Sequence, residues 1–156
     1  MKRKNYSGGM TLIELLLVIS ILALSLSIVI PKIEKRDYHL MTSSRMLRDD
    51  IRNIRYMKMA EGKNLKISLE SNQYKVIENL KVIKRVQLEK DFKITYTETF
   101  RGGDISFSYN GAPTYGGGTI TIFDNKKNKY CEITIVPATG RILLKDEIYK
   151  GYSGDK

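Results

Sequence analysis

The feature that most constrains this chain is an apolar run from Met10 to Ile30 that contains a single charged residue, Glu14. As a helix, the run would be about 31 Å long, close to the roughly 30 Å hydrocarbon core of a bilayer. A carboxylate in hydrocarbon costs roughly 3 kcal/mol even on the more lenient insertion scales. The run therefore predicts a transmembrane helix in which Glu14 requires a compensating positive charge.

The residues before the run are basic, with Lys2, Arg3 and Lys4 and no acidic residue. This charge bias predicts that the N-terminus stays in the cytoplasm and that the C-terminal part lies outside. An ordinary secretory signal is a poor match, because the run is long and Ile30–Ile33 offers no small-residue cleavage site. A plain signal-anchor fits the length but leaves Glu14 unexplained. A cut before the run, between Gly9 and Met10, would keep the helix and create a new α-amine.

The segment Gly9–Leu16 resembles the leader-and-helix signature of type IV prepilins and type II secretion pseudopilins. The resemblance implies that a membrane prepilin peptidase cleaves after Gly9 and methylates Met10, where the family most often has phenylalanine. Glu14 matches the family's assembly glutamate, and Pro31 falls where the family often has a helix-bending proline. The implied partners are the peptidase, other pilins or pseudopilins in a filament, and the membrane.

Two pairings could compensate Glu14 after such a cut. The amine of Met10 lies four residues earlier and could pair with it inside one helix. In the family the favoured partner is the amine of a neighbouring subunit, which sets the axial stagger of a filament. The sequence leaves both pairings open.

A second helical pattern follows Pro31. An apolar stripe with alternating spacings of four and three residues comprises Leu40, Ser44, Leu47, Ile51, Ile54 and Lys58. Met41 and Met57 lie beside it, and Arg45, Arg48, Asp49, Asp50, Arg52 and Arg55 occupy the other faces. Gly62 is a plausible stop. The pattern predicts one helix from about Thr11 to Glu61, bent near Pro31, whose second half packs on a domain.

After Gly62 the apolar period changes to two, which indicates strands. The expected strands are 65–69, 74–77, 81–87, 93–97, 105–109, 119–123, 130–136 and 141–144, separated by turns rich in glycine and asparagine. Short strands after one long helix indicate an α+β fold of the type IV pilin kind, with the helix on an antiparallel sheet. The expected divisions are a cleaved leader (1–9), a transmembrane or filament-core helix (10–30), its amphipathic continuation (31–62), a β-rich globular domain (63–150) and a tail (151–156).

The C-terminal half carries a second resemblance. Ile105–Phe107 with Asn110-Gly111, Gly118–Ile122, Ile133–Ile135 and Gly140-Arg141 resemble the H-type pseudopilin and fimbrial T-like minor pilin group. Glycine at 140 suits a tight turn before a strand. Arg141 is then either a charge at the sheet edge or a contact with an acidic partner. In some DNA-uptake relatives a basic segment near this Gly-Arg is proposed to touch DNA, but here Asp146 and Glu147 offset Arg141 and Lys145.

Composition excludes several kinds of site. The chain has one histidine, His39, and one cysteine, Cys131, so it has no internal disulfide and no cysteine-rich metal cluster. We expect His39 on a helix surface and Cys131 in the core. No nucleophile with a base stands out, which predicts a chain that is not an enzyme and needs no metal or cofactor. The net charge of +10 favours acidic partners such as nucleic acid, anionic lipid or cell-wall polymer, or reflects a solvated lysine-rich surface.

These observations predict a minor pilin or pseudopilin. It would sit first in the cytoplasmic membrane and then in a cell-surface filament, serving DNA uptake, a pilus or type II-like protein secretion. The alternative is a DNA-binding module at the tip of a competence filament.

Overall fold

The computed structural model describes residues 11–29, 35–145 and 147–151, without the side chains of 26–29. The chain divides into two compact units, one up to residue 34 and one from residue 35, and each is described by itself. The leader residues Lys2, Arg3, Lys4, Gly9 and Met10, together with Pro31, lie outside the described residues.

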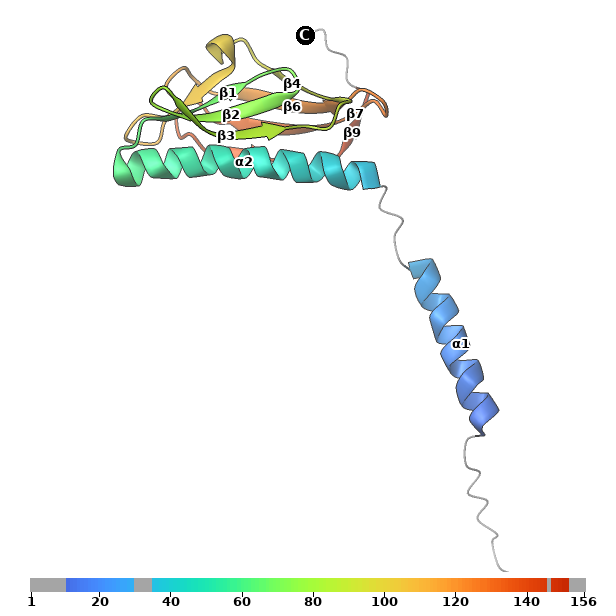
Figure 1. Cartoon of the computed structure of the whole chain (residues 1–156). Helices are drawn as coiled ribbons and strands as arrows, with labels where there is room; N and C mark the ends of the chain where they lie inside the picture. The colour runs from blue at the N-terminus through green and yellow to red at the C-terminus, as the bar shows by residue number, and fades with distance from the viewer. Residues whose placement is uncertain (1–10, 30–34, 146, 152–156) are drawn as a thin grey trace, which may run out of the picture. The chain divides into compact units, whose positions relative to one another are not determined.

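The first unit contains one helix, α1, from Leu12 to Val29 (Figure 1). Its side chains are apolar on all sides, and all those described, from Thr11 to Ser25, are exposed. The hydroxyls of Ser20 and Ser25 donate to the carbonyl oxygens of Leu16 and Ile21, at 2.7 and 2.8 Å. Helix α1 therefore satisfies these polar groups internally and has no polar face.

In the part of the chain that the structure describes, no helix has both the length and the hydropathy required to cross a membrane. The predicted transmembrane run extends from 10 to 30, and both its end residues lie outside the described part. The transmembrane assignment, the division into domains and the predicted bend near Pro31 stay predictions.

The second unit begins with α2, Lys35–Glu61. Five positions of the predicted stripe are its buried residues: Leu40, Ser44, Leu47, Ile51 and Ile54. The helix ends where Gly62 adopts a φ of 66° and donates its N–H to the carbonyl of Lys58, at 3.2 Å. A positive φ at this position favours glycine and satisfies a terminal carbonyl, so the predicted stop is confirmed.

Two sheets follow, where the sequence suggested one. Their strands are β1 Leu65–Leu69, β2 Gln73–Glu78, β3 Lys81–Gln87, β4 Phe92–Tyr96, β5 Asp104–Ser106, β6 Gly118–Asp124, β7 Lys129–Ile135, β8 Ile142–Leu144 and β9 Tyr149–Lys150. The first sheet has the order β3-β2-β1-β5, and the second has β4-β6-β7-β8, with β9 also on β7. Every pair is antiparallel, as predicted.

The expectation of one sheet was wrong. The alternation of apolar and polar residues predicts which face of a strand is buried, but it does not predict which strands lie beside it. The chain leaves the first sheet after β3 and returns to it at β5, which pairs with β1 at Ile67 and Ile105. The predicted strand from Ile105 to Tyr109 also ends early, at Ser106. Beyond it, a tight turn at Asn110-Gly111 joins an isolated bridge between Phe107 and Pro113.

Helix α2 packs against strands of both sheets and closes one hydrophobic core (Figure 1). The core runs from Leu40 on the helix to Ile142 on β8, all within the second unit. Cys131 is fully buried in it, as predicted, and burial raises the pKa of its thiol. Every residue of this core lies after residue 35, so the core belongs to the second unit alone.

Candidate functional site

Glu14 caps the start of α1. Its Oε2 accepts hydrogen bonds from the backbone N–H of Thr11 and from the Thr11 hydroxyl, at 3.2 and 3.3 Å. The Thr11 hydroxyl oxygen in turn accepts from the N–H of Glu14, at 3.3 Å. This reciprocal arrangement is a capping box, which satisfies backbone donors that a helix start leaves without partners.

The capping box gives Glu14 a local role that the sequence interpretation missed. The signal was readable, because Thr11-Leu12-Ile13-Glu14 has the Thr-x-x-Glu spacing of such a box. Only one carboxylate oxygen of Glu14 makes these bonds, so the other oxygen is left to accept from further donors. Helix capping and pairing with an α-amine are therefore compatible roles of the same side chain.

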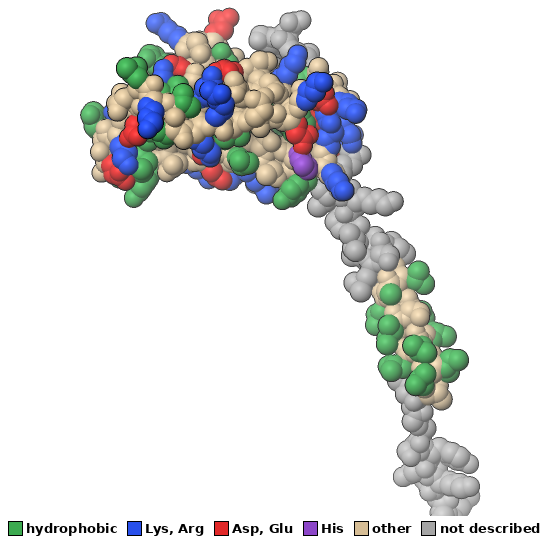
Figure 2. Space-filling view, in the orientation of Figure 1, with side chains coloured by type: hydrophobic (Ala, Val, Ile, Leu, Met, Phe, Trp, Pro, Cys, Tyr) green, Lys and Arg blue, Asp and Glu red, His purple; other side chains and the backbone are tan. Residues whose placement is uncertain are grey.

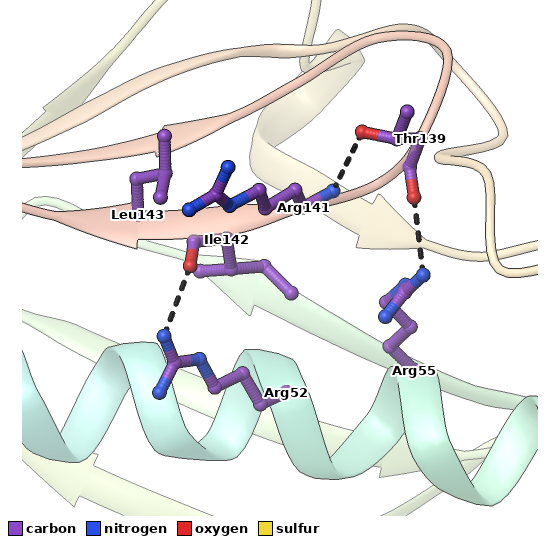
Figure 3. Close-up of a pocket in the computed structure, with 6 residues that line it drawn as sticks. All are labelled: Arg52, Arg55, Thr139, Arg141, Ile142 and Leu143. Carbon is purple, nitrogen blue, oxygen red and sulfur yellow. Dashed lines mark hydrogen bonds between the residues drawn. The ribbon is translucent and has the colours of Figure 1, made fainter.

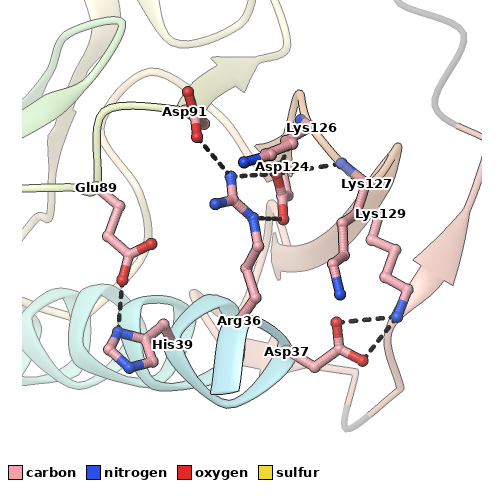
Figure 4. Close-up of polar contacts among 9 residues, drawn as sticks. All are labelled: Arg36, Asp37, His39, Glu89, Asp91, Asp124, Lys126, Lys127 and Lys129. Atoms are coloured by element: carbon pink, nitrogen blue, oxygen red, sulfur yellow. Dashed lines mark hydrogen bonds and ion pairs between the residues drawn. The ribbon is translucent and has the colours of Figure 1, made fainter. Parts of the chain in front are cut away.

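The start of α2 is fixed to the second sheet by Arg36 (Figure 4). Its Nε and Nη2 donate to both carboxylate oxygens of Asp124 on β6, at 2.6 and 2.8 Å. Nη2 also donates to Asp91, at 2.9 Å, and the guanidinium lies 5.5 Å from the centroid of the Phe92 ring. We call Arg36, Asp91 and Asp124 the arginine clasp. Bidentate geometry makes such a pair directional as well as strong.

Asp124 is 1% exposed and keeps its charge inside the clasp. Burial alone would raise the pKa of its carboxyl group, but hydrogen bonds from Arg36 and from the backbone amides of Lys126 and Lys127 outweigh it, and the pKa lies below its usual value. Asp37 pairs with Lys129 beside the clasp, at 2.7 Å. The start of α2 is thus held by neutralised charges.

His39 lies one turn further along α2, where its ring is about half exposed. Its Nδ1 lies 2.5 Å from Oε1 of Glu89 (Figure 4). The predicted surface position is confirmed, and the contact links α2 to the segment before β4. No group of three or more His, Cys, Asp and Glu residues suited to a metal occurs among residues 11–29, 35–145 and 147–151.

The far end of α2 meets the Gly-Arg motif through Arg55. Its Nε donates to the carbonyl of Gly111, at 2.9 Å, and its Nη2 donates to the carbonyl of Thr139, at 3.0 Å. Gly140 has a φ of 63°, and a Cβ there would lie 2.0 Å from the oxygen of Gly111. Glycine at 140 is therefore required both by the backbone conformation and by the approach of the Asn110-Gly111 turn.

A shallow pocket of about 490 Å³ lies beside this junction (Figure 3). It is lined by Arg52, Arg55, Thr139, Arg141, Ile142 and Leu143. Arg52 donates from Nη2 to the carbonyl of Ile142, at 3.1 Å, and the backbone N–H of Arg141 donates to the Thr139 hydroxyl, at 3.3 Å. Figure 3 shows the guanidinium groups of Arg52 and Arg141 at one end of the pocket and Arg55 at the other. We call this the arginine pocket.

The arginine pocket differs from the arginine clasp in its charge balance. Its lining includes three guanidinium groups and no carboxylate. Arg52 and Arg55 are held by neutral backbone carbonyls, and the Arg141 side chain makes no hydrogen bond or ion pair with any described residue. A carbonyl orients a guanidinium without cancelling its charge, so the pocket is suited to an anion.

Arg52 and Arg55 were expected on faces of the helix away from its buried stripe, with no assigned role, and sequence reasoning missed their place beside Arg141. A helical spacing of three puts both on one face, but their partners lie 56 to 90 residues away along the chain. Lys145, the other basic residue near the motif, is neutralised by Glu132 at 2.8 Å. Figure 2 shows basic and acidic side chains interspersed on the visible face of the second unit.

The N-terminal part of the chain matches a known sequence motif. Residues 4–30 match the prokaryotic N-terminal methylation motif. No curated protein is similar to this chain in sequence.

Two solved structures of the minor pseudopilin EpsH, from the type 2 secretion system of Vibrio cholerae, share the fold. One aligns with a TM-score of 0.56 and 11% identity, covering 69% of this chain and 96% of that one. The other aligns with a TM-score of 0.52 and 12% identity, covering 74% and 96%.

The chain thus combines a prepilin N-methylation motif with the fold of a minor pseudopilin. The predicted pilin-like α+β fold and the predicted resemblance are confirmed.

Proposed function

We propose that this protein is a minor structural subunit of a pilus-like filament. Prepilin peptidase removes the leader after Gly9 and methylates the new N-terminus at Met10. The processed chain waits in the cytoplasmic membrane and then enters a filament with other pilins or pseudopilins. It performs no catalysis and needs no cofactor.

The observation that carries this proposal is the surface of α1. Its described side chains are exposed and include ten large hydrophobic residues between Leu12 and Leu24. Figure 2 shows them as hydrophobic atoms over the described part of the helix. A helix that is apolar all round is covered by lipid or by other helices. In the proposed function, lipid covers the apolar surface of α1 while the subunit is in the membrane, and neighbouring helices cover it in the filament.

The basic leader sets the orientation that we propose. Lys2, Arg3 and Lys4 keep the N-terminus in the cytoplasm, and the unit from residue 35 lies on the outer side of the membrane. Glu14 then meets the α-amine produced by cleavage, in the same or a neighbouring subunit. Pro31 lies between the two helices, where it can bend the connection.

The machine that we favour is one of the type II secretion kind, because the structural matches come from such a system. A DNA-binding role at a filament tip remains the second candidate, supported by the unneutralised guanidinium groups of the arginine pocket. Phosphate contacts release counterions, so this role requires DNA affinity that falls steeply between 50 and 200 mM salt. Absence of DNA binding by the full chain in detergent at low salt would dismiss it.

Processing provides the test of the main proposal. The full chain is produced with and without a prepilin peptidase, and the mass of its N-terminal peptide is measured. We expect methylated Met10 as the first residue only when the peptidase is present. The Gly9→Val variant should keep its leader, because a branched side chain obstructs an extended backbone in a narrow protease site, whereas the matched Gly8→Val variant should be cleaved. A chain that keeps its leader beside an active peptidase would refute the proposal.

A further inference from the structure

We propose that the arginine pocket receives a carboxylate side chain from a different filament subunit, and that Arg52 and Arg141 bind it. The inference rests on the proposed function and names the partner chemistry of the globular unit. It concerns contacts made by this unit, which the N-terminal motif does not describe.

The arginine pocket carries an excess of positive charge. Three guanidinium groups line one pocket of about 490 Å³ whose lining residues include no acid. The arginine clasp of the same domain shows the contrasting arrangement, since Arg36 there meets two carboxylates. Guanidinium groups retain their charge at all physiological pH values, so the pocket attracts an anion under every condition of growth.

The three arginines differ in how many of their hydrogen-bond donors are used within the chain. Arg55 donates from Nε to Gly111 and from one terminal nitrogen to Thr139, so its guanidinium group is held by the chain itself. Arg52 uses one terminal nitrogen on Ile142, and Arg141 uses no side-chain nitrogen on any described residue. Their guanidinium groups lie at the same end of the pocket (Figure 3). They are therefore the pair with donors left for a ligand, and a planar fork of donors matches a carboxylate.

The surroundings of the pocket favour a protein partner over nucleic acid. The pocket lining also includes two apolar residues, Ile142 and Leu143, and the Leu143 side chain is 37% exposed. A phosphate polymer needs a track of unpaired cations, but neighbouring Lys145 is committed to Glu132 and stacks 5.3 Å from the ring of Tyr149. A single anionic group beside an apolar contact matches a glutamate or aspartate next to an apolar residue.

The net charge of the chain favours a different subunit over a second copy of this chain as the partner. The net charge is +10, and removal of the three basic leader residues still leaves +7. Two such domains repel each other, whereas an acidic neighbour is steered toward the pocket. The partner is therefore a different subunit with an acidic surface.

The test uses the ¹⁵N-labelled full chain in detergent micelles and follows the arginine side-chain Nε–Hε signals by NMR. The probes are N-acetyl-Glu-Leu-amide, its Gln-Leu counterpart and a short DNA duplex. We expect the Glu-Leu peptide to shift the Arg52 and Arg141 signals and the Gln-Leu peptide to leave them unchanged. Arg141→Gln should abolish the shift of the Arg52 signal. The control, Arg101→Gln, makes the same charge change at an exposed site away from the pocket and should leave the Arg52 shift as it is in the wild type.

Two results would overturn the inference in this assay. One is the absence of any shift with the Glu-Leu peptide at tens of millimolar. The other is a DNA duplex that shifts both signals where the peptide does not, which assigns the pocket to phosphate.

Filament incorporation of the full chain in cells gives the second readout. We expect Arg141→Glu to lower incorporation about tenfold, equivalent to about 1.4 kcal/mol, and Arg101→Glu to leave it unchanged. Normal incorporation of Arg141→Glu contradicts this inference while the proposed function stands, provided that the wild-type chain is cleaved after Gly9. Failure of cleavage in the wild type defeats the proposed function instead.

Discussion

Helices α1 and α2 are consecutive along the chain but are stabilised in different ways. Helix α2 buries one stripe against two sheets and fixes both its ends with arginines, at Arg36 and Arg55. Helix α1 buries none of its described side chains, and its capping box and the hydroxyls of Ser20 and Ser25 bond within the helix itself. The hydrophobic core is thus built from α2 and the two sheets, and the exposed apolar side chains of α1 are those that the proposed assembly would cover.

The sharpest test of this contrast compares truncations of one side chain in each helix. Ile51→Ala removes a fully buried side chain, and we expect it to cost about 2–5 kcal/mol of unfolding free energy. Leu17→Ala, at an exposed position of α1, should leave the unfolding of the domain unchanged and should lower filament incorporation instead. Denaturant melts of the full chain in detergent measure the first effect.

The buried thiol gives an independent readout of the same melts. Because burial raises the pKa of Cys131, its reaction with a thiol reagent should be slow in the native state and should follow global unfolding. Ile51→Ala should then accelerate labelling, and Leu17→Ala should not. Equal labelling rates in both variants would break the proposed independence of the two helices.

The arginine clasp is expected to make the next largest contribution to the free energy of unfolding. Asp124→Asn keeps the shape of the side chain but removes its charge beside Arg36. We expect it to lower the free energy of unfolding by about 2–3 kcal/mol at pH 6. The matched control is Asp104→Asn, which breaks an ion pair with Lys66 at 2.6 Å in a more exposed setting and should cost less than about 1 kcal/mol. Equal costs would show that burial does not strengthen the clasp.

The pH dependence of the clasp follows from the lowered pKa of Asp124. A carboxyl group whose folded pKa lies below its ordinary value of 3.8 stabilises the fold fully above that pH. Its contribution is lost as the pH falls through the folded pKa. The stability gap between wild type and Asp124→Asn should therefore be constant above about pH 5 and should narrow toward pH 3. A gap that widens with acid would contradict this assignment.

Gly140 provides a smaller and more local effect. Gly140→Ala places a Cβ 2.0 Å from the Gly111 oxygen and strains a φ of 63°, so we expect a cost of about 1–3 kcal/mol. Gly102→Ala is the matched control, because its φ is 65° but nothing lies within 4 Å of the added carbon. It should cost about 1 kcal/mol. Similar costs for the two would mean that the junction between the Gly-Arg motif and the Asn110-Gly111 turn is loose.

Sequence patterns predicted what depends on local spacing. The stripe from Leu40 to Ile54 and the strands around Ile67 and Ile133 follow from helical and two-residue periods. The two-sheet arrangement and the pairing of Arg36 with Asp124 could not be predicted, because they join segments far apart along the chain. Strand β9 is only Tyr149–Lys150, too short to give a period.

The candidate sites divide in the same way. Gly140 and Arg141 were identified by resemblance, and the structure gives Gly140 a steric reason that the resemblance alone did not supply. Arg52 could be assigned to the arginine pocket only from the structure, in which β8 lies beside α2. The role of Glu14 in capping was readable from its spacing to Thr11, whereas the role in assembly that we propose for it rests on the motif.

Filament incorporation of Glu14 variants tests the central claim, that α1 assembles through a charge at its start, most directly. Glu14→Gln retains an oxygen that can accept the Thr11 N–H bond of the capping box but removes the charge, Glu14→Ala removes both, and Thr11→Ala removes the capping hydroxyl while keeping the charge. The account predicts that Glu14→Gln and Glu14→Ala are both excluded from filaments and that Thr11→Ala enters them. Normal entry of Glu14→Gln would contradict it, because the glutamate would then act only as a helix cap.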